Sequence, residues 1–230
     1  MSGPELIQAT IAARSLPDTA EQARALFGLP PGFPDPELAD WGIVNEILGL
    51  GRTYVEIVAP SSETSALHRF LARGEGGYVV GMKVPDTDAM IERAAERGVR
   101  VAHRQEFHGA DIVQLHPGEL GVMLEADRLP DGKDWHYDDW DVPARPADAA
   151  TGDLVAVDIA VEDPAGTAEV WAHVLDAELD GPAAVRAGGV IRFVPAEGRR
   201  GLVAVDVLAP EASEHTIAGL LVRCVTEEKA

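Results

Sequence analysis

Two glutamates, Glu56 and Glu125, stand at matching places in two similar segments, TYVEIV (53–58) and GVMLEAD (121–127). Successive side chains of a strand point to opposite faces. In both segments this alternation puts apolar side chains on one face and the glutamate on the other. Because the apolar face is expected to pack on the helices, both glutamates are predicted to line a concave surface.

Two carboxylates in a partly apolar hollow either bind a cation or perturb each other's ionisation, which prepares a group for proton transfer. We therefore predict Glu56 and Glu125 to be catalytic. Tyr54 and Met123 share their faces and are predicted to bind substrate. The alternative is that one or both glutamates lie solvated at an open rim, with no chemical role.

The strands that must position these glutamates belong to a unit repeated along the chain. Segments 6–30, 78–101 and 154–179 each contain a short apolar strand, an acidic or proline-containing turn and an amphipathic helix, and further strand-like segments follow. Strand, helix and three strands, repeated, differ from the strict alternation of a parallel α/β fold. The sequence predicts an α+β fold of βαβββ units, with mixed, cup-shaped sheets and helices on the outer face.

The repeats divide the chain into three parts. Residues 1–128 hold two paired units, which are predicted to form a complete cup. Residues 129–152 are rich in Pro, Asp and aromatic side chains and are predicted to be a linker. Residues 153–230 hold a third unit and a degenerate fourth without its helix. Such a half-cup exposes an apolar face, so it either closes on the N-terminal half or pairs with a second copy; we favour a homodimer.

Composition excludes several classes of function. The net charge of −20 argues against nucleic-acid binding. No apolar run approaches the ~20 residues of a membrane span, and the N-terminus lacks a secretory pattern. The single cysteine, Cys224, rules out a disulfide framework and a cysteine-rich zinc site. We expect a cytoplasmic protein whose partner is a small-molecule ligand.

Several short motifs resemble the vicinal oxygen chelate superfamily (glyoxalase, bleomycin resistance, dioxygenase), and most of all its glyoxalase-like proteins. They are the turn VPDTDA (84–89), the GxxxE run 121–125, the HPxxxG segment 116–121 and the Trp-rich stretch after it, at 135–140. The resemblance covers essentially residues 5–225. It implies that paired units form one cup.

The resemblance also implies a metal held by one residue from the first strand and a glutamate from the last strand of each unit. These positions fall on Gln8, Glu56 and Glu125, while the fourth falls on Val79, which cannot bind metal. Three oxygen ligands suit Mg²⁺ or Mn²⁺ better than Zn²⁺ or Fe, and the sequence is equally compatible with no metal. The lack of a two-His-one-carboxylate site argues against a dioxygenase.

Two functions stay open at this point. The first is an isomerase, epimerase or lyase that abstracts a proton next to a carbonyl of a small oxygenated substrate, with Gln8 orienting substrate or metal. The second is a non-catalytic protein that binds and sequesters a small molecule. Both retained glutamates favour the enzyme, and the lost histidines favour the binding protein. In the third unit, the matching positions are predicted to be Ala156 and Asp206.

Three of the seven histidines have predicted places. His116 precedes Pro117 in a turn, where capping is its expected use. His103 and His108 flank a strand and a turn of the second unit and are placed near the cup mouth, with their direction left open.

Overall fold

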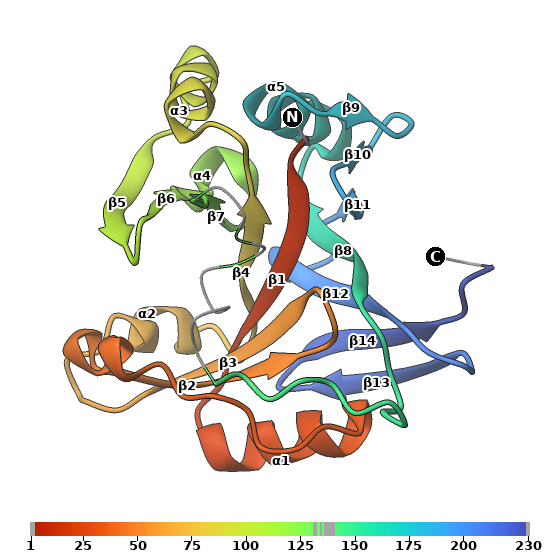
Figure 1. The fold of residues 1–230 in the computed structure, drawn as a ribbon. Coiled ribbons are helices and arrows are strands. Elements are labelled where there is room, and N and C mark those ends of the chain that lie inside the picture. The colour runs from red at the N-terminus through yellow and green to blue at the C-terminus, as the bar shows by residue number, and fades with distance from the viewer. Residues whose placement is uncertain (1–2, 131–132, 134, 136–140, 229–230) are drawn as a thin grey trace.

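Two seven-stranded sheets make up most of the molecule (Figure 1). The computed structural model describes residues 3–130, 133, 135 and 141–228. The strands of the first sheet are β1 (Glu5–Ala12), β2 (Ile43–Gly49), β3 (Tyr54–Pro60), β4 (Gly76–Lys83), β5 (Val101–Phe107), β6 (Ala110–Leu115) and β7 (Met123–Arg128). Their order across the sheet is β2-β3-β1-β4-β7-β6-β5.

The second sheet comes from the C-terminal part of the chain and has the order β13-β14-β12-β8-β11-β10-β9. Its strands are β8 (Leu154–Val161), β9 (Glu178–Leu179), β10 (Ala184–Arg186), β11 (Val190–Pro195), β12 (Gly201–Leu208), β13 (Ser213–Ile217) and β14 (Leu220–Val225). The helices are α1 (Leu16–Phe27), the 3₁₀ helix η1 (Pro36–Trp41), α2 (Leu67–Leu71), α3 (Thr87–Glu96), α4 (Pro117–Leu120) and α5 (Pro164–Leu175).

Strand pairing follows the same pattern in both sheets. In the first, β1 and β4 are antiparallel at the centre, and each is parallel to the last strand of its own unit, β3 or β7. In the second, β8 and β12 are antiparallel, and they are parallel to β11 and β14. These mixed sheets confirm the predicted α+β fold.

This pairing corrects the position predicted for Asp206. The sequence placed residues 201–210 as the closing strand of the third unit, with Asp206 at the glutamate position. Instead, β12 opens the fourth unit, because it pairs with β8 as β4 pairs with β1. The closing strand of the third unit is β11, and its residue at the glutamate position is Arg192.

Helix ends follow the local sequence. The Asp86 carboxylate accepts a hydrogen bond of 3.0 Å from the Ala89 amide at the start of α3, which is the usual role of an aspartate before a helix. Gly28 ends α1 in the left-handed conformation, at φ 70°. His116 caps α4, with Nδ1 accepting from the Gly118 amide at 3.1 Å, so its predicted capping use is confirmed.

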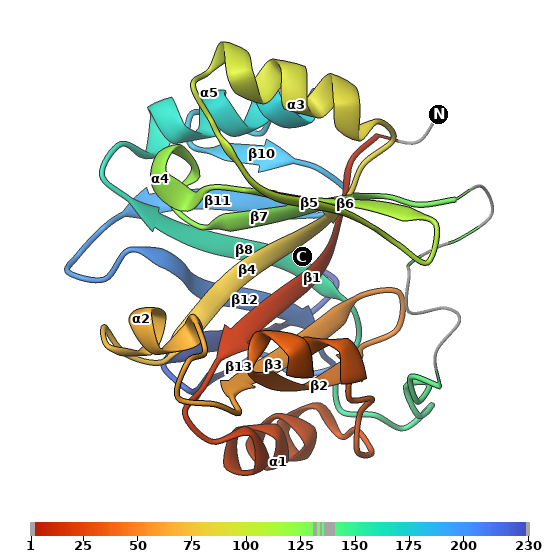
Figure 2. The ribbon, with the colours of Figure 1, turned by 90° about the vertical axis from the view of Figure 1, so that its left-hand side faces the viewer.

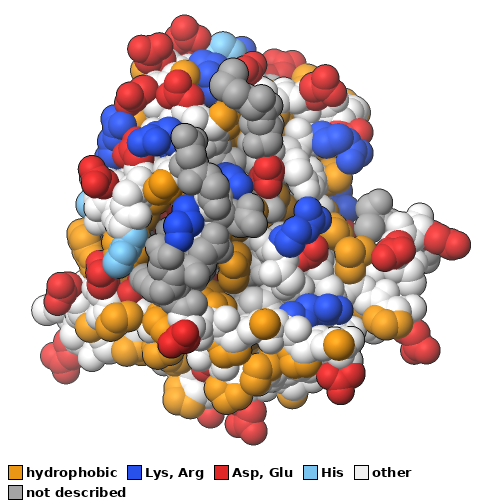
Figure 3. Space-filling model, viewed as in Figure 1, with side chains coloured by type: hydrophobic (Ala, Val, Ile, Leu, Met, Phe, Trp, Pro, Cys, Tyr) orange, Lys and Arg blue, Asp and Glu red, His pale blue; other side chains and the backbone are white. Residues whose placement is uncertain are grey.

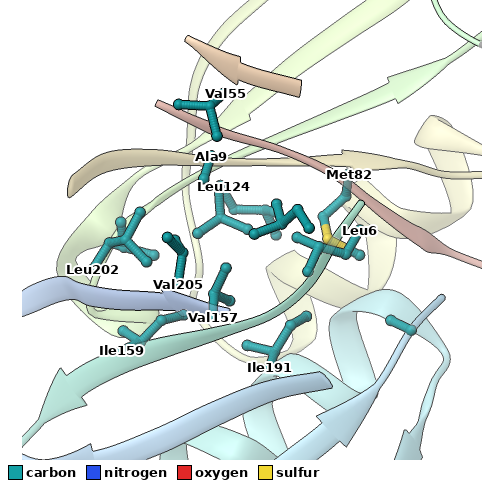
Figure 4. Close-up of a cluster of buried hydrophobic side chains, with 14 of the residues drawn as sticks. Leu6, Ala9, Val55, Met82, Leu124, Val157, Ile159, Ile191, Leu202 and Val205 are labelled. Carbon is teal, nitrogen blue, oxygen red and sulfur yellow. The ribbon is translucent and has the colours of Figure 1, made fainter. Parts of the chain in front are cut away.

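The main core lies where the convex faces of the two sheets meet (Figure 4). Alternation puts one set of buried apolar side chains of each sheet there: Leu6, Ala9, Val55, Met82 and Leu124 from the first, and Val157, Ile159, Ile191, Leu202 and Val205 from the second. Full burial of one such side chain contributes roughly 1.5–3 kcal/mol. The sequence predicted that this apolar face packs on helices. That prediction was wrong, because the face packs mainly on the other sheet.

The helices close the ends of this two-sheet stack. Seen from the side, α3 and α5 lie together at one end and α1 lies at the other (Figure 2). Trp171 of α5 is fully buried, as expected, and its Nε1 donates to the Leu120 carbonyl at 3.0 Å. The apolar face of the C-terminal half is therefore covered within the chain, and no second copy is needed to cover it.

The surface agrees with the scattered charge of the sequence. Acidic side chains are spread around the outline of the face in Figure 3 and do not form one patch there. Within the described part of the chain, no helix is both long and apolar enough to cross a membrane.

Candidate functional site

Glu56 lies on the concave face of the first sheet with three hydrogen-bond donors around its carboxylate. Asn45 Nδ2 donates to Oε1 at 2.7 Å, while Gln8 Nε2 and Thr10 Oγ1 donate to Oε2 at 2.9 and 3.0 Å. Thr10 is its direct neighbour on the parallel strand β1. Only 7 % of Glu56 is exposed, so the side chain is held in one place inside the cup.

The orientation of Asn45 follows from a second contact. Its Oδ1 accepts from the Asp35 amide at 2.8 Å, which leaves Nδ2 as the atom that faces Glu56. Charge-assisted hydrogen bonds of this kind favour the ionised form of a carboxyl group. Asn45 therefore positions Glu56 and also opposes the rise in its pKa that burial causes.

Burial dominates the ionisation of Glu56. It raises the pKa of the carboxyl from 4.5 to about 7; the hydrogen bond from Asn45 lowers the pKa, and the negative charge of Glu125 raises it again. A carboxyl group that titrates near neutral pH can both take and return a proton there. The sequence predicted that the two glutamates perturb each other's ionisation; for Glu56, burial is the larger cause and the charge of Glu125 a smaller one.

Gln8 lies between the two glutamates, across the two central strands. Its neighbour on β4 is Gly81, which in turn pairs with Glu125 on β7. A Cβ at position 81 would stand 2.8 Å from Gln8 Cβ, so glycine leaves room for the glutamine. While Nε2 donates to Glu56, the buried Oε1 has no hydrogen-bond partner among the described residues. It is free to accept a hydrogen bond from a ligand.

Glu125 is half-buried on the same concave face and accepts a hydrogen bond of 2.7 Å from Gln114 Nε2. Strands β1 and β4 separate it from Glu56, and three strand spacings amount to about 14 Å along a flat sheet. The two carboxyl groups thus face the cup from opposite sides while still interacting electrostatically.

The rims of the cup approach each other across its mouth. Trp41 of η1 stands edge-to-face with His103 of β5, with ring centroids 5.5 Å apart, and His108 Nε2 lies 3.7 Å from a Glu37 oxygen. Since η1 leads into β2 and β5 is at the far edge of the sheet, these contacts show that the sheet curls strongly. Both histidines lie at the mouth, as placed from the sequence.

Apolar side chains fill one end of the cup. Trp135 is fully buried against Ile7 and Ile47, and half-buried neighbours complete this cluster: Phe33, Tyr54, Leu129 and Val142. The segment between the two halves thus contributes to the cup. His136, Tyr137 and Trp140 of the same Trp-rich stretch lie outside the described residues.

The other end of the cup contains Tyr78, packed edge-on against Phe70 with ring centroids 4.9 Å apart. Burial and then the charge of Glu125 raise the pKa of its phenol. Tyr78 therefore stays protonated and remains a hydrogen-bond donor at neutral pH.

Of the residues predicted for the site, Gln8 contacts Glu56 directly, and Tyr54 lies in the apolar cluster near it. Met123 is half-buried on β7, paired with Val79. Sequence reasoning missed Thr10, Asn45, Gln114 and Trp135. Strand alternation contained a signal for Thr10, two residues after Gln8, and Trp135 belonged to the Trp-rich stretch without a predicted place in the cup; no sequence pattern pointed to Asn45 or Gln114.

The hydrogen bonds of Glu56 do not fit a resident divalent metal. Both of its oxygens already accept from N–H or O–H groups, and Val79 and Gly81 offer no ligand atom on the second unit's first strand. Within the part of the chain that the structure describes, no group of three or more His, Cys, Asp or Glu could hold a metal. Gln8 Oε1 and Glu125 are the remaining oxygen donors of the predicted ligand set.

Comparison with known proteins gives a consistent family match. Residues 9–175 match the family model of the glyoxalase-like domain. Over 121 residues the chain is 27 % identical to mitochondrial methylmalonyl-CoA epimerase of Bos taurus. This match covers 49 % of this chain and 68 % of that protein. A solved methylmalonyl-CoA epimerase in complex with methylmalonyl-CoA and NH4+ is 26 % identical at a TM-score of 0.50, over 56 % of this chain and 97 % of that one.

A second solved structure resembles the whole molecule. A hypothetical protein from Staphylococcus aureus reaches a TM-score of 0.68 over 97 % of this chain and 99 % of its own, at 10 % identity. This likeness concerns the fold alone. The pairing of two such sheets in one chain therefore occurs in at least one other protein.

The raised pKa of Glu56 predicts a pH-dependent stability. Between pH 4.5 and about 7 the native chain keeps a proton that the unfolded chain has lost, so this group's contribution is largest at low pH and falls as pH rises. The free energy of unfolding should fall by about 3 kcal/mol across this pH range through Glu56. Burial also raises the pKa of the Asp127 carboxyl, which adds to the pH dependence of all variants. Urea denaturation at pH 4.5 and 8 should therefore show that Glu56→Gln reduces the dependence by about 3 kcal/mol, while Glu106→Gln on exposed β5 leaves it unchanged; equal profiles for all three proteins would contradict the prediction.

A metal titration tests the ligand set. Because hydrogen bonds satisfy both Glu56 oxygens, 1 mM MnCl₂ or MgCl₂ should leave the melting temperature of chelator-treated protein unchanged within about 1 °C. A ligand that binds the native state at 100 times its Kd would add roughly 2.7 kcal/mol and raise it clearly. A rise that Glu56→Ala abolishes would restore the predicted metal site of Gln8, Glu56 and Glu125.

Proposed function

Because the chain belongs to the glyoxalase-like domain family, within the vicinal oxygen chelate superfamily, we propose that it is an epimerase- or isomerase-type enzyme that abstracts a proton next to a carbonyl. The observation that supports this most directly is Glu56, a buried, triply hydrogen-bonded carboxyl group whose pKa lies at about 7. The similarity to methylmalonyl-CoA epimerases supports the same type of reaction.

In this mechanism Glu56 is the base. Its ionised form takes the proton from the carbon next to the carbonyl, and its neutral form is stabilised by the same burial that raises its pKa. Gln8, Thr10 and Asn45 fix the carboxylate, and Oε1, which accepts one hydrogen bond among the described residues, keeps a second lone pair that can take the proton. Gln8 Oε1 accepts a hydrogen bond from the substrate and helps to orient it.

Glu125 is the second acid–base group. Epimerisation requires that the carbon lose its proton on one side and regain one on the other. Glu56 and Glu125 reach the cup from different units, with β1 and β4 between them. A substrate held between them can give a proton to one carboxyl and receive one from the other, which favours inversion over a lyase reaction.

Non-catalytic binding is the second candidate. The apolar cluster around Trp135, Ile7 and Ile47 favours a ligand with an apolar part, and such a surface serves sequestration as well as catalysis. Retention of the ligand without proton exchange would distinguish the two functions.

Location and assembly belong to the same proposal. Cys224 is free and buried, which fits a reducing compartment such as the cytoplasm. A homodimer would have to use exposed side chains, since the convex faces are already covered within one chain. The exposed Leu179 on edge strand β9 is one such side chain.

Proton exchange tests the catalytic role. In D₂O, the wild-type protein should exchange the C2 hydrogen of methylmalonyl-CoA, or of a smaller carbonyl compound from a panel, faster than buffer, as followed by ¹H NMR. The rate should rise with pH and level off above about 7, where Glu56 is ionised. Glu56→Gln should lower it by about 10²–10⁴-fold, and Glu125→Gln should slow inversion more than exchange.

The controls separate folding from chemistry. Glu106→Gln, a change on the exposed edge strand β5, should keep wild-type rates. Turnover of Glu56→Gln within a few-fold of wild type would exclude it as the base. Tight binding of a panel compound with no exchange above buffer would move the conclusion to sequestration.

Sedimentation equilibrium at micromolar concentration tests the homodimer. A dimer gives twice the chain mass of 24.4 kDa. A single species with the mass of one chain would show that the protein is a monomer, and the dimer proposal would then be wrong.

A further inference from the structure

The second sheet carries an internal repeat that the proposed function does not use. The pentapeptide LVAVD occurs at 154–158 in β8 and at 202–206 in β12. The partner strands also match, as VIRFV at 190–194 and LVRCV at 221–225. Asp158 pairs with Arg192 and Asp206 with Arg223 across the parallel strands, so the repeat brings two aspartates and two arginines together at the centre of the sheet.

These four side chains form a closed ring of ion pairs. Arg192 donates from Nε to Asp158 at 2.5 Å and from Nη2 to Asp206 at 2.7 Å. Arg223 donates from Nε to Asp206 at 2.5 Å and from Nη2 to Asp158 at 2.7 Å. Each aspartate therefore accepts one bond on each oxygen, and the two halves of the ring are related by the pseudo-two-fold axis of the sheet.

The ring lies where the first sheet has its carboxyl pair. In the first sheet Thr10 pairs with Glu56, and Gly81 pairs with Glu125. The matching pairs of the second sheet are Asp158 with Arg192, and Asp206 with Arg223. Each glutamate of the cup is thus replaced by an arginine, and the two concave faces present opposite charges at equivalent positions.

Both arginines keep donors that the ring does not use. The ring engages the Nε and Nη2 side of each guanidinium, and Nη1 of Arg192 and Arg223 has no hydrogen bond among the described residues. The aspartate side chains are 10 % and 7 % exposed, whereas the arginines are 35 % and 25 % exposed. The aspartates are therefore nearly buried, the arginine side chains keep part of their surface in solvent, and Nη1 is the guanidinium nitrogen that the ring does not use.

The surroundings leave these guanidinium groups accessible. Ala156 and Ala204 lie buried beside the ring and add no bulk. Leu221 and Val190, half-buried on the same face, add apolar surface. Glu214 is the cross-strand neighbour of Arg223, is exposed on edge strand β13 and forms no ion pair among the described residues. The carboxylate of Glu214 reduces the positive potential beside Arg223 but not beside Arg192.

We propose that the concave face of the second sheet binds an oxyanion, the carboxylate or phosphoryl group of a small ligand, through Arg192 and Arg223. A guanidinium presents parallel N–H groups that match two oxygens of such an anion. The buried aspartates fix both guanidinium planes in advance, as supporting groups do in preorganised sites. A ring kept only for stability has less reason to expose its cations, because buried ion pairs often add little over apolar packing.

Titration of the full chain with inorganic phosphate and, separately, with malonate tests this site, with NaCl at equal ionic strength as the reference. Calorimetry should show saturable binding of one or both anions. Arg192→Lys and Arg223→Lys keep the charge but lose the fork, and each should weaken binding at least tenfold. Arg186→Lys, a change to an exposed arginine paired with Asp180, should leave it unchanged.

A measurement on the wild-type chain covers the case in which a ring variant fails to fold. Phenylglyoxal modification, mapped by mass spectrometry, should be slowed at Arg192 and Arg223 by the bound anion and unchanged at Arg52, which is 92 % exposed. Binding of phosphate alone or malonate alone identifies the ligand group.

Three results would overturn the proposal: a response equal to that of NaCl, lysine variants that bind as wild type does, or unprotected arginines. Glu56→Gln should bind the anions normally, so this test is independent of the function proposed for the first sheet.

Discussion

The contact between the convex faces of the two sheets determines how the rest of the molecule is arranged. Each sheet has one largely apolar face, and neither half could leave that face in water. Packing them together, with α1 at one end and α3 and α5 at the other, buries both. The concave faces are then turned away from each other, where polar and charged side chains can meet a ligand. A chain with one repeated unit fewer would expose the apolar face of the first sheet.

Position on the concave face decides what a carboxyl group does here. Glu56 is buried among donors, and the resulting balance leaves its pKa at about 7, because desolvation outweighs the hydrogen bond from Asn45. Asp158 and Asp206 are buried to a similar extent in the second sheet, but two guanidinium groups neutralise them directly. The two kinds of carboxyl group also lie on different strands: Glu56 lies on β3 beside Thr10 of the central strand, whereas Asp158 lies on the central strand β8 beside Arg192. The residue across the parallel strand therefore decides whether the carboxyl group meets a neutral donor or a cation.

Much of the fold could be predicted from the sequence, because period-two alternation and repeated turns are local signals. Strand alternation was sufficient to place Glu56 on the concave face, and the repeats indicated mixed sheets. Strand order in the C-terminal half was not predictable in the same way: with the fourth helix missing, β12 resembled a closing strand, and Asp206 was assigned to the wrong unit. Asn45 and Trp135 reach Glu56 and the cup through tertiary contacts, which no local pattern encodes.

The repeat in the second sheet also bears on how the two halves came to differ. LVAVD and its arginine partner occur twice with the same cross-strand pairing, so the two units of this sheet are more alike than those of the first sheet. The first sheet is unlike on its two sides, with Gln8 and Thr10 on β1 against Val79 and Gly81 on β4, so β1 supplies side-chain donors to Glu56 whereas those two positions of β4 carry no polar side chain. The ring needs like groups on both sides, since each aspartate must bind both arginines. Asymmetry in one sheet and symmetry in the other therefore follow from what each concave face holds.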